Sequence, residues 1–156
     1  MSISLCLQLP NAGFEKWHGS KPTYVYESGG TMFWDTGNHG SQKAGTPGVV
    51  HLQGDIGNAE AMKTLVAELA AKHNGCLDFL VNNAGVSYKC RAEDFPMEQF
   101  DNIMNVNVKY LFQMSVICYP YLKKSADKGR IINITSMSAH LGFSEVVPYC
   151  ASKGAV

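Results

Sequence analysis

Three short apolar runs, separated by segments with helical periodicity, constrain the fold of this sequence most strongly. The runs are Val49–Leu52, Leu77–Val81 and Ile131–Ile134. Short, mostly apolar runs of this kind are typical of parallel strands that are covered on both faces. Because helical segments separate the runs, residues 48–135 are predicted to form strand–helix–strand–helix–strand with right-handed crossovers. The predicted fold class is therefore α/β, with a parallel sheet and flanking helices.

The two intervening segments each show an apolar stripe at helical spacing. Asn58 is the predicted N-cap of the first helix, and the second is expected to begin near Pro96 and to end between Pro120 and Lys124. The stripe of the first helix consists of Met62, Leu65, Val66, Leu69 and Ala70. The predicted inner face of the second consists of Phe100, Ile103, Met104, Val108, Leu111, Phe112 and Ser115.

A Y-x-x-x-K pair follows the third apolar run, with Tyr149 and Lys153 four residues apart. On a helix this spacing places the phenol and the ammonium on one face, one turn apart. Pro148 suits the first turn of such a helix, where its missing N–H is not needed. Ser136 lies just after the strand, where its hydroxyl can face the same cleft.

These side chains suit proton transfer coupled to hydride transfer. A free phenol is a poor base near neutral pH, and a cation held close to a phenol favours the phenolate form. A tyrosine paired with a lysine can therefore act as a general acid/base. A serine hydroxyl beside the pair can hydrogen-bond the substrate oxygen. The alternative is that both residues simply lie on an exposed helix face, where such residues are common.

Two further motifs accompany the pair. Asn82-Asn83-Ala84-Gly85 follows the second apolar run, and Asn107 lies within the second helical segment. In this order and spacing the three motifs closely resemble the classical short-chain dehydrogenase/reductase family, over roughly residues 48–156. The resemblance implies a Rossmann-like fold that interconverts a secondary alcohol and a ketone with NAD or NADP.

The resemblance also implies roles for individual residues. Tyr149 would be the acid/base, Lys153 its electrostatic and ribose partner, and Ser136 the substrate donor. Asn107 would support a proton relay through a bound water. The alternative is that it is a hydrogen-bonded core asparagine with a structural role only. Tyr110 departs from the family, which often has glycine at this position.

The expected cofactor contacts are Asp55, Asn82, Ala84 and Gly85, together with the tyrosine and lysine of the pair. Asp55 would lie beside the adenine ring, or it would only be a turn residue or helix-start acid. The Asn82–Gly85 segment would let the main chain approach a ribose, or it would only form a turn.

Residues 1–47 do not show the family pattern. The glycine-rich loop T-G-x-x-x-G-x-G, whose N–H groups would bind the cofactor pyrophosphate, is not found there. Thr31–Asp35 is interpreted as a possible second strand that ends in a ribose-binding acid. The alternative is that residues 1–47 are a divergent or foreign leader that does not complete the fold.

The expected domains are thus a divergent region, 1–47, and a partial Rossmann-like domain, 48–156. The chain resembles a family member that lacks its end and its beginning. The fold is therefore expected to be incomplete at both ends. Its function would be that of a truncated oxidoreductase; the alternative is a non-catalytic remnant. The segments around Ser136 and Tyr149 look most like those of 2-deoxy-gluconate and polyol dehydrogenases.

Composition narrows the possible partners and compartment. Thirteen basic and thirteen acidic residues balance, which gives no reason to expect nucleic acid or a membrane surface as a partner. No signal peptide is expected, because the apolar start is short and has no basic flank. The five cysteines form no C-x-x-C pair and the five histidines show no ligand spacing. We therefore expect a cytoplasmic protein without a metal site, acting on a small molecule, with a homo-oligomer possible.

Overall fold

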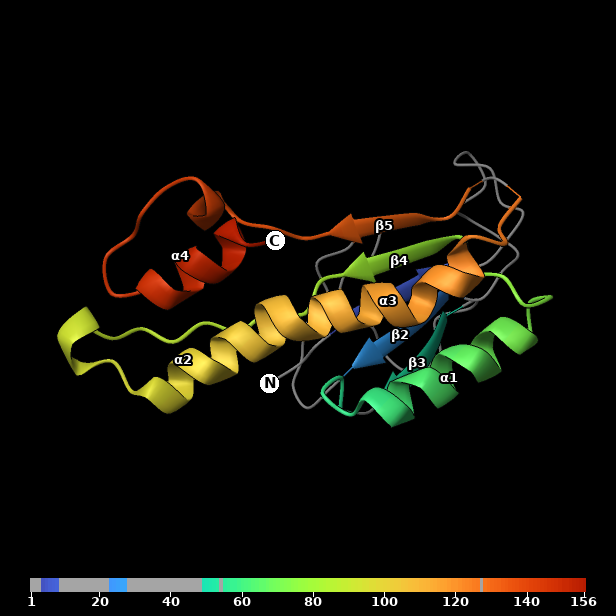
Figure 1. Cartoon of the computed structure of the whole chain (residues 1–156), viewed down its shortest axis with the longest axis horizontal. Helices are drawn as coiled ribbons and strands as arrows, with labels where there is room; N and C mark the ends of the chain where they lie inside the picture. The colour runs from blue at the N-terminus through green and yellow to red at the C-terminus, as the bar shows by residue number, and fades with distance from the viewer. Residues whose placement is uncertain (1–3, 9–22, 28–48, 54, 127) are drawn as a thin grey trace.

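The computed structural model describes residues 4–8, 23–27, 49–53, 55–126 and 128–156 (Figure 1). A five-stranded sheet with the order β3-β2-β1-β4-β5 forms its centre. The strands are β1 (Ser4–Gln8), β2 (Thr23–Glu27), β3 (Val49–Gln53), β4 (Phe79–Asn82) and β5 (Arg130–Asn133). The order 3-2-1-4-5 is that of a doubly wound dinucleotide-binding sheet.

Four of the five strands run in one direction. β2 is parallel to β3 and β4 is parallel to β5, whereas β1 is antiparallel to both β2 and β4. The predicted parallel alignment of β3, β4 and β5 in one sheet is therefore confirmed. Gln8, at the carboxyl end of β1, pairs with Phe79 at the amino end of β4. The carboxyl end of β1 consequently lies at the sheet edge opposite to the carboxyl ends of β4 and β5.

The central strands β1 and β2 come from residues 1–47, where the sequence pattern predicted no strand at these positions. Thr23–Glu27 reads T-Y-V-Y-E, and such β-branched and aromatic residues are favoured in strands. The run Thr31–Asp35, interpreted as a possible strand, lies outside the described residues. The N-terminal region thus contributes the middle of the sheet.

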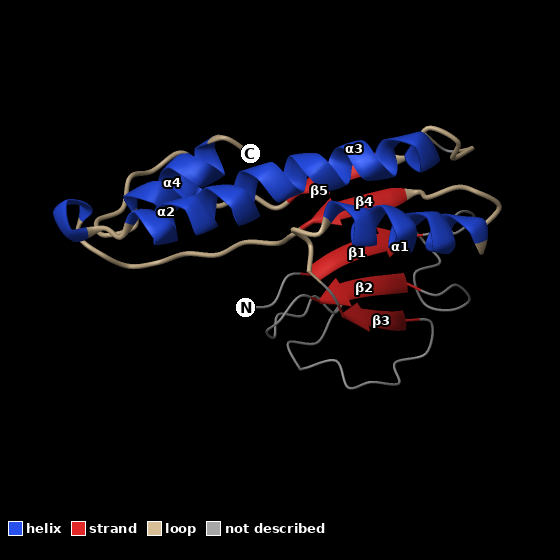
Figure 2. Ribbon diagram, turned by 60° about the horizontal axis from the view of Figure 1, so that its bottom comes forward, coloured by secondary structure: helices blue, strands red, loops and turns tan. Residues whose placement is uncertain are grey.

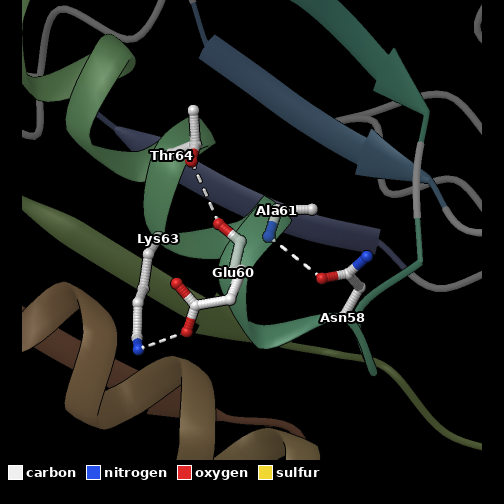
Figure 3. Close-up of polar contacts among 5 residues, drawn as sticks. All are labelled: Asn58, Glu60, Ala61, Lys63 and Thr64. Atoms are coloured by element: carbon white, nitrogen blue, oxygen red, sulfur yellow. Dashed lines mark hydrogen bonds and ion pairs between the residues drawn. The ribbon is translucent and has the colours of Figure 1, made fainter.

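Helices α1 (Ala59–Ala71) and α3 (Leu111–Leu122) lie across one face of the sheet (Figure 2). The predicted cap of α1 is confirmed, because the Asn58 side chain accepts a hydrogen bond from the N–H of Ala61 at 3.1 Å (Figure 3). In the first turn Lys63 pairs with Glu60 at 2.7 Å. The apolar stripe of α1 faces the core, and four of its residues are buried: Met62, Val66, Leu69 and Ala70.

The second helical segment is one long rod with a change of pitch in its middle. It consists of α2 (Met97–Met104), a π-helical segment (Asn105–Tyr110) and α3, which ends within the predicted range. A π-helical turn holds more residues than an α-helical one, so it rotates every later side chain around the axis. The predicted inner face is therefore wrong at Phe112, which is 69% exposed. The buried residues of α3 are instead Met114, Cys118 and Leu122.

Short 3-10 turns, Ala92–Asp94 and Met137–Ala139, precede α2 and α4 (Val147–Gly154) respectively. α2 and α4 pack side by side beyond the carboxyl ends of β4 and β5 (Figure 1). In the part of the chain that is described, no helix is long and apolar enough to cross a membrane. The core between sheet and helices includes Ile56, Leu77, Leu80, Val86, Ile103 and Val106.

Gly129 is the tightest point of the connection between α3 and β5. A Cβ atom there would lie 2.5 Å from the carbonyl oxygen of Leu122 and 2.8 Å from its Cα. Because backbone atoms cannot move aside locally, Gly129→Ala is expected to lower the free energy of unfolding by about 1–3 kcal/mol. Urea unfolding followed by circular dichroism measures this loss.

Gly142→Ala is the matched control for that substitution. A Cβ atom at Gly142 would meet nothing within 4 Å, so its effect should stay within about 0.5 kcal/mol. Equal stabilities for the two variants would show that the approach of Gly129 to Leu122 is not tight in solution.

Candidate active site

Tyr149 and Lys153 share one face of α4, as their spacing predicted. Pro148 occupies the first turn of the helix. Nζ of Lys153 lies 5.9 Å from the centroid of the Tyr149 ring, which is within cation–π range. The phenol is half-buried, and no protein group among the described residues is hydrogen-bonded to its hydroxyl. Within the described part of the chain, no protein group therefore competes with a ligand for this hydroxyl.

Lys153 is buried to an extent that is unusual for a lysine. Its side chain and backbone together are only 5% exposed, and Nζ donates a hydrogen bond to the carbonyl oxygen of Ile134 at 2.7 Å. No carboxylate in the described ranges forms an ion pair with it. Burial lowers the pKa of Lys153 below its ordinary value, because desolvation penalises the ammonium.

This shift predicts a pH dependence of stability. Between the lowered pKa and the ordinary lysine value of about 10.4, the unfolded chain binds more protons at Lys153 than the folded chain does. Stability from this residue therefore rises as the pH increases through that window. Lys153→Met removes the titrating group, so the stability of wild type relative to the variant should increase as the pH rises toward the ordinary lysine pKa of about 10.4. Urea unfolding at several pH values tests this, and parallel curves would contradict it.

Asn107 is fully buried in the π-helical segment and connects three parts of the chain. Its Oδ1 accepts from the N–H of Val86 at 2.7 Å, and its Nδ2 donates to the carbonyl oxygen of Val86 at 2.9 Å. The second N–H of the amide donates to Oγ of Ser152 at 2.8 Å. The buried amide is thus fully hydrogen-bonded, and it ties α4 to the loop after β4.

The loop after β4 approaches both groups closely at Gly85. A Cβ atom there would lie 3.5 Å from Nζ of Lys153 and 3.7 Å from Oδ1 of Asn107. Ala84, just before it, is buried, whereas Gly85 is exposed. The backbone of Gly85 therefore forms an accessible wall beside the buried ammonium.

Ser136 caps the 3-10 turn Met137–Ala139, which packs against α4. Its Oγ accepts from the N–H of Ser138 at 3.2 Å. The approach of the two elements is visible at Gly154, where a Cβ atom would lie 3.7 Å from the carbonyl oxygen of Ala139. Ser136 and Lys153 are thus on adjoining elements, although no direct contact joins Ser136 to Tyr149.

The two remaining polar candidates are held by protein contacts. Oδ1 of Asp55 accepts a hydrogen bond from the N–H of Gly57 at 2.8 Å. This is the contact expected if Asp55 is a turn residue. Nδ2 of Asn82 donates to Oγ of Ser115 and to Oδ1 of Asn133, each at 3.0 Å. Asn82 therefore joins β4 to α3 and β5.

Sequence reasoning missed three members of this cluster: Ser152, the backbone of Val86 and the carbonyl of Ile134. Ser152 lies three residues after Tyr149, a spacing that places both on one helix face. That spacing was the signal that could have found it. The backbone groups carry no sequence signal, because every residue has them.

Comparison with known proteins decides the family. A family model described as short chain dehydrogenase matches residues 36–156. The chain belongs to the short-chain dehydrogenase family. The cluster of Asn107, Tyr149 and Lys153 therefore lies in a short-chain dehydrogenase domain.

Two of the similar relatives are named as dehydrogenases of a sugar acid and of a sugar. The chain is 40% identical over 102 residues to the 2-dehydro-3-deoxy-D-gluconate 5-dehydrogenase of Bacillus subtilis, covering 65% of this chain. It is 36% identical over 111 residues to the L-fucose dehydrogenase of Bos taurus, covering 70% of this chain. The chain spans 39% of the first relative and 40% of the second.

Solved short-chain dehydrogenase structures share the fold. The ligand-free aldohexose dehydrogenase of Thermoplasma acidophilum superposes with a TM-score of 0.66 at 27% identity, over 73% of this chain and 44% of that one. A gluconate 5-dehydrogenase from Burkholderia cenocepacia, in complex with NADP and tartrate, superposes with a TM-score of 0.62 at 28% identity. That match covers 69% of this chain and 42% of the other.

Proposed function

We propose that the chain carries the proton-transfer site of an NAD(P)-dependent oxidoreductase that interconverts a secondary alcohol and a ketone. The observation that carries the proposal is the buried ammonium of Lys153 beside the ring of Tyr149. Burial of a lysine without a carboxylate partner is costly, so a functional reason for it is expected. The phenol beside it is the group that such a charge would activate.

In this proposal the protein handles the proton. The Tyr149 hydroxyl donates a proton to the carbonyl oxygen of a ketone, or the phenolate accepts one from an alcohol. The hydroxyl of Ser136 hydrogen-bonds the same oxygen, and Lys153 stabilises the phenolate left after donation. Asn107 keeps α4 and the loop after β4 in register. The nicotinamide, when bound, supplies or accepts the hydride.

The residues fit one end of NAD(P) better than the other. Gly85 and Lys153 together form a backbone wall and a cation where the nicotinamide ribose would lie. The exposed carboxylate of Asp55 and the backbone of Ala84 and Asn82 would line the adenosine side. For the pyrophosphate, the usual N–H groups follow the first strand, but here the carboxyl end of β1 is at the other edge. The phosphate end of the site is therefore expected to be weak.

The proposed substrate class is polyols and sugar acids. Both named sequence relatives act on sugars or sugar acids by name, and one structural relative holds NADP with tartrate. The four cysteines in the described part are free thiols, which supports a reducing, cytoplasmic location, and a homo-oligomer is compatible with the exposed apolar residues of α3.

The second candidate is a non-catalytic remnant of such an enzyme. The reversed β1 favours it, because a weak phosphate end would limit cofactor binding. In that case the cluster around Lys153 would persist only as packing.

An assay of the full chain separates the two candidates. The purified protein is incubated with NAD or NADP at millimolar concentration and a panel of polyols, sugar acids and apolar secondary alcohols. Reduced cofactor is measured by absorbance. We expect slow oxidation of polyols or sugar acids. If no alcohol is oxidised at saturating cofactor, the non-catalytic remnant is the better candidate.

A further inference from the structure

Ser152 occupies the centre of the site, although the proposed chemistry assigns it no role. Its side chain is 0% exposed. Its hydroxyl donates to the carbonyl oxygen of Tyr149 at 2.7 Å and accepts from Nδ2 of Asn107 at 2.8 Å. Both hydrogen-bonding functions of the hydroxyl are thus used, one within α4 and one across to the π-helical segment.

The amide of Asn107 can take only one orientation in this arrangement. The N–H of Val86 donates to the amide oxygen, and the carbonyl of Val86 accepts from the amide nitrogen. A flipped amide would place oxygen against the carbonyl and nitrogen against the N–H. One N–H of Nδ2 is therefore always directed at Ser152. Because Val86 belongs to the loop after β4, this amide transmits the position of that loop to α4.

The bond from Ser152 to Tyr149 completes the connection. A serine hydroxyl that bonds back to the preceding turn of its own helix is held in a single rotamer. Lys153 follows Ser152 directly, and its Nζ must reach past Gly85 to the carbonyl of Ile134. A rotation of α4 would therefore move the phenol and the ammonium together. Among the described residues, the side-chain hydrogen bonds that oppose such a rotation run from Ser152 to Asn107 and from Asn107 to the backbone of Val86 in the loop.

We infer that Ser152 is a positioning residue, which fixes the helix turn carrying Tyr149 and Lys153 against Gly85 through Asn107. The inference rests on the proposed function for its catalytic consequence, but not for its geometry. An alanine at this position fills nearly the same volume, so it removes the hydrogen bonds and little else. It leaves the Nδ2 N–H of Asn107 without its acceptor.

Ser125 provides the matched control. It is also buried, and its hydroxyl donates to Oδ1 of Asp78 at 2.6 Å. This pair lies at the amino end of β4, at the far end of the strand from the site. Ser125→Ala therefore also removes a buried hydroxyl, and both variants should have lower melting temperatures than wild type.

The experiment compares both variants by kinetics and by NMR. In Ser152→Ala, kcat is expected to fall about 10- to 100-fold with little change in KM, because a small misplacement of reacting groups slows the reaction by that order. Ser125→Ala should keep kcat within about 3-fold. Ser152→Cys, which keeps a group that can form hydrogen bonds, although weaker ones, should lie between wild type and Ser152→Ala.

The NMR measurement does not depend on activity. Titration of the lysine side chains, isotope-labelled at Cε, should show that Lys153 titrates at higher pH in Ser152→Ala than in wild type. In Ser125→Ala its titration should be unchanged. If the chain shows no turnover, the proposed function fails while this titration still tests the positioning. Unchanged titration of Lys153 in Ser152→Ala, or equal losses of kcat in both alanine variants, would overturn the inference.

Discussion

Replacing Tyr149 by phenylalanine is expected to lower kcat by about 10²–10⁴ at saturating cofactor, the usual contribution of a general acid/base. The substitution removes one oxygen atom and keeps the aromatic ring beside Nζ of Lys153. No protein group in the described part of the chain is hydrogen-bonded to that oxygen, so the substitution leaves none of these groups without its partner. The free energy of unfolding should therefore change by less than about 0.5 kcal/mol.

Tyr119→Phe is the control for this substitution. Tyr119 lies on the exposed side of α3, away from α4, so its variant should match wild type in both rate and stability. Retention of more than about a tenth of wild-type kcat in Tyr149→Phe would assign the proton transfer to another group.

The cofactor should bind the isolated chain weakly, with dissociation constants for NADH and NADPH of about 1 mM or higher. The pyrophosphate is normally bound by N–H groups at a helix N-terminus after the first strand. Residues 1–47 lack the T-G-x-x-x-G-x-G loop, and the carboxyl end of β1 lies at the wrong edge of the sheet. Loss of several kcal/mol of phosphate contacts weakens binding tenfold for each ~1.4 kcal/mol.

Calorimetric titration with two ligands tests this expectation. Reduced nicotinamide mononucleotide contains the end of the cofactor that Gly85 and Lys153 would hold, without the pyrophosphate and adenosine. If the phosphate end contributes little, this mononucleotide and NADH should bind within about 3-fold of each other. Micromolar NADH binding, with much weaker binding of the mononucleotide, would show that residues 1–47 do provide a phosphate site.

The elements with strong periodicity could be predicted from sequence. The runs at Val49, Phe79 and Ile131 are β3, β4 and β5, and the stripe from Met62 to Ala70 is α1. β1 and β2 were not predicted, because residues 1–47 are rich in glycine and show no helical stripe that would mark them as part of an alternating strand–helix pattern. Their place between β3 and β4 depends on pairing with distant strands, which no local pattern encodes.

The candidate site shows the same division. The spacing of Tyr149 and Lys153 within α4 followed from helix geometry alone. The burial of Lys153 and its bond to Ile134 could not be foreseen, since they depend on how α4 packs against the loop after β4. The π-helical segment was also unforeseen, and it accounts for both the exposure of Phe112 and the inward position of Asn107. Tyr110, at the end of this segment, packs against Gly57.

Deuteride transfer tests the central claim, that this cluster is a working proton-transfer site, most directly. The chain is incubated with NADH or NADPH deuterated at the transferable position and with a keto sugar acid, at cofactor concentrations that saturate the site. Mass spectrometry detects the product even at very low turnover. We predict an alcohol with one deuterium on the carbinol carbon from wild type, and at least about 100-fold slower labelling by Tyr149→Phe. Absence of labelled alcohol from wild type at saturation, or equal labelling by both proteins, would contradict the claim.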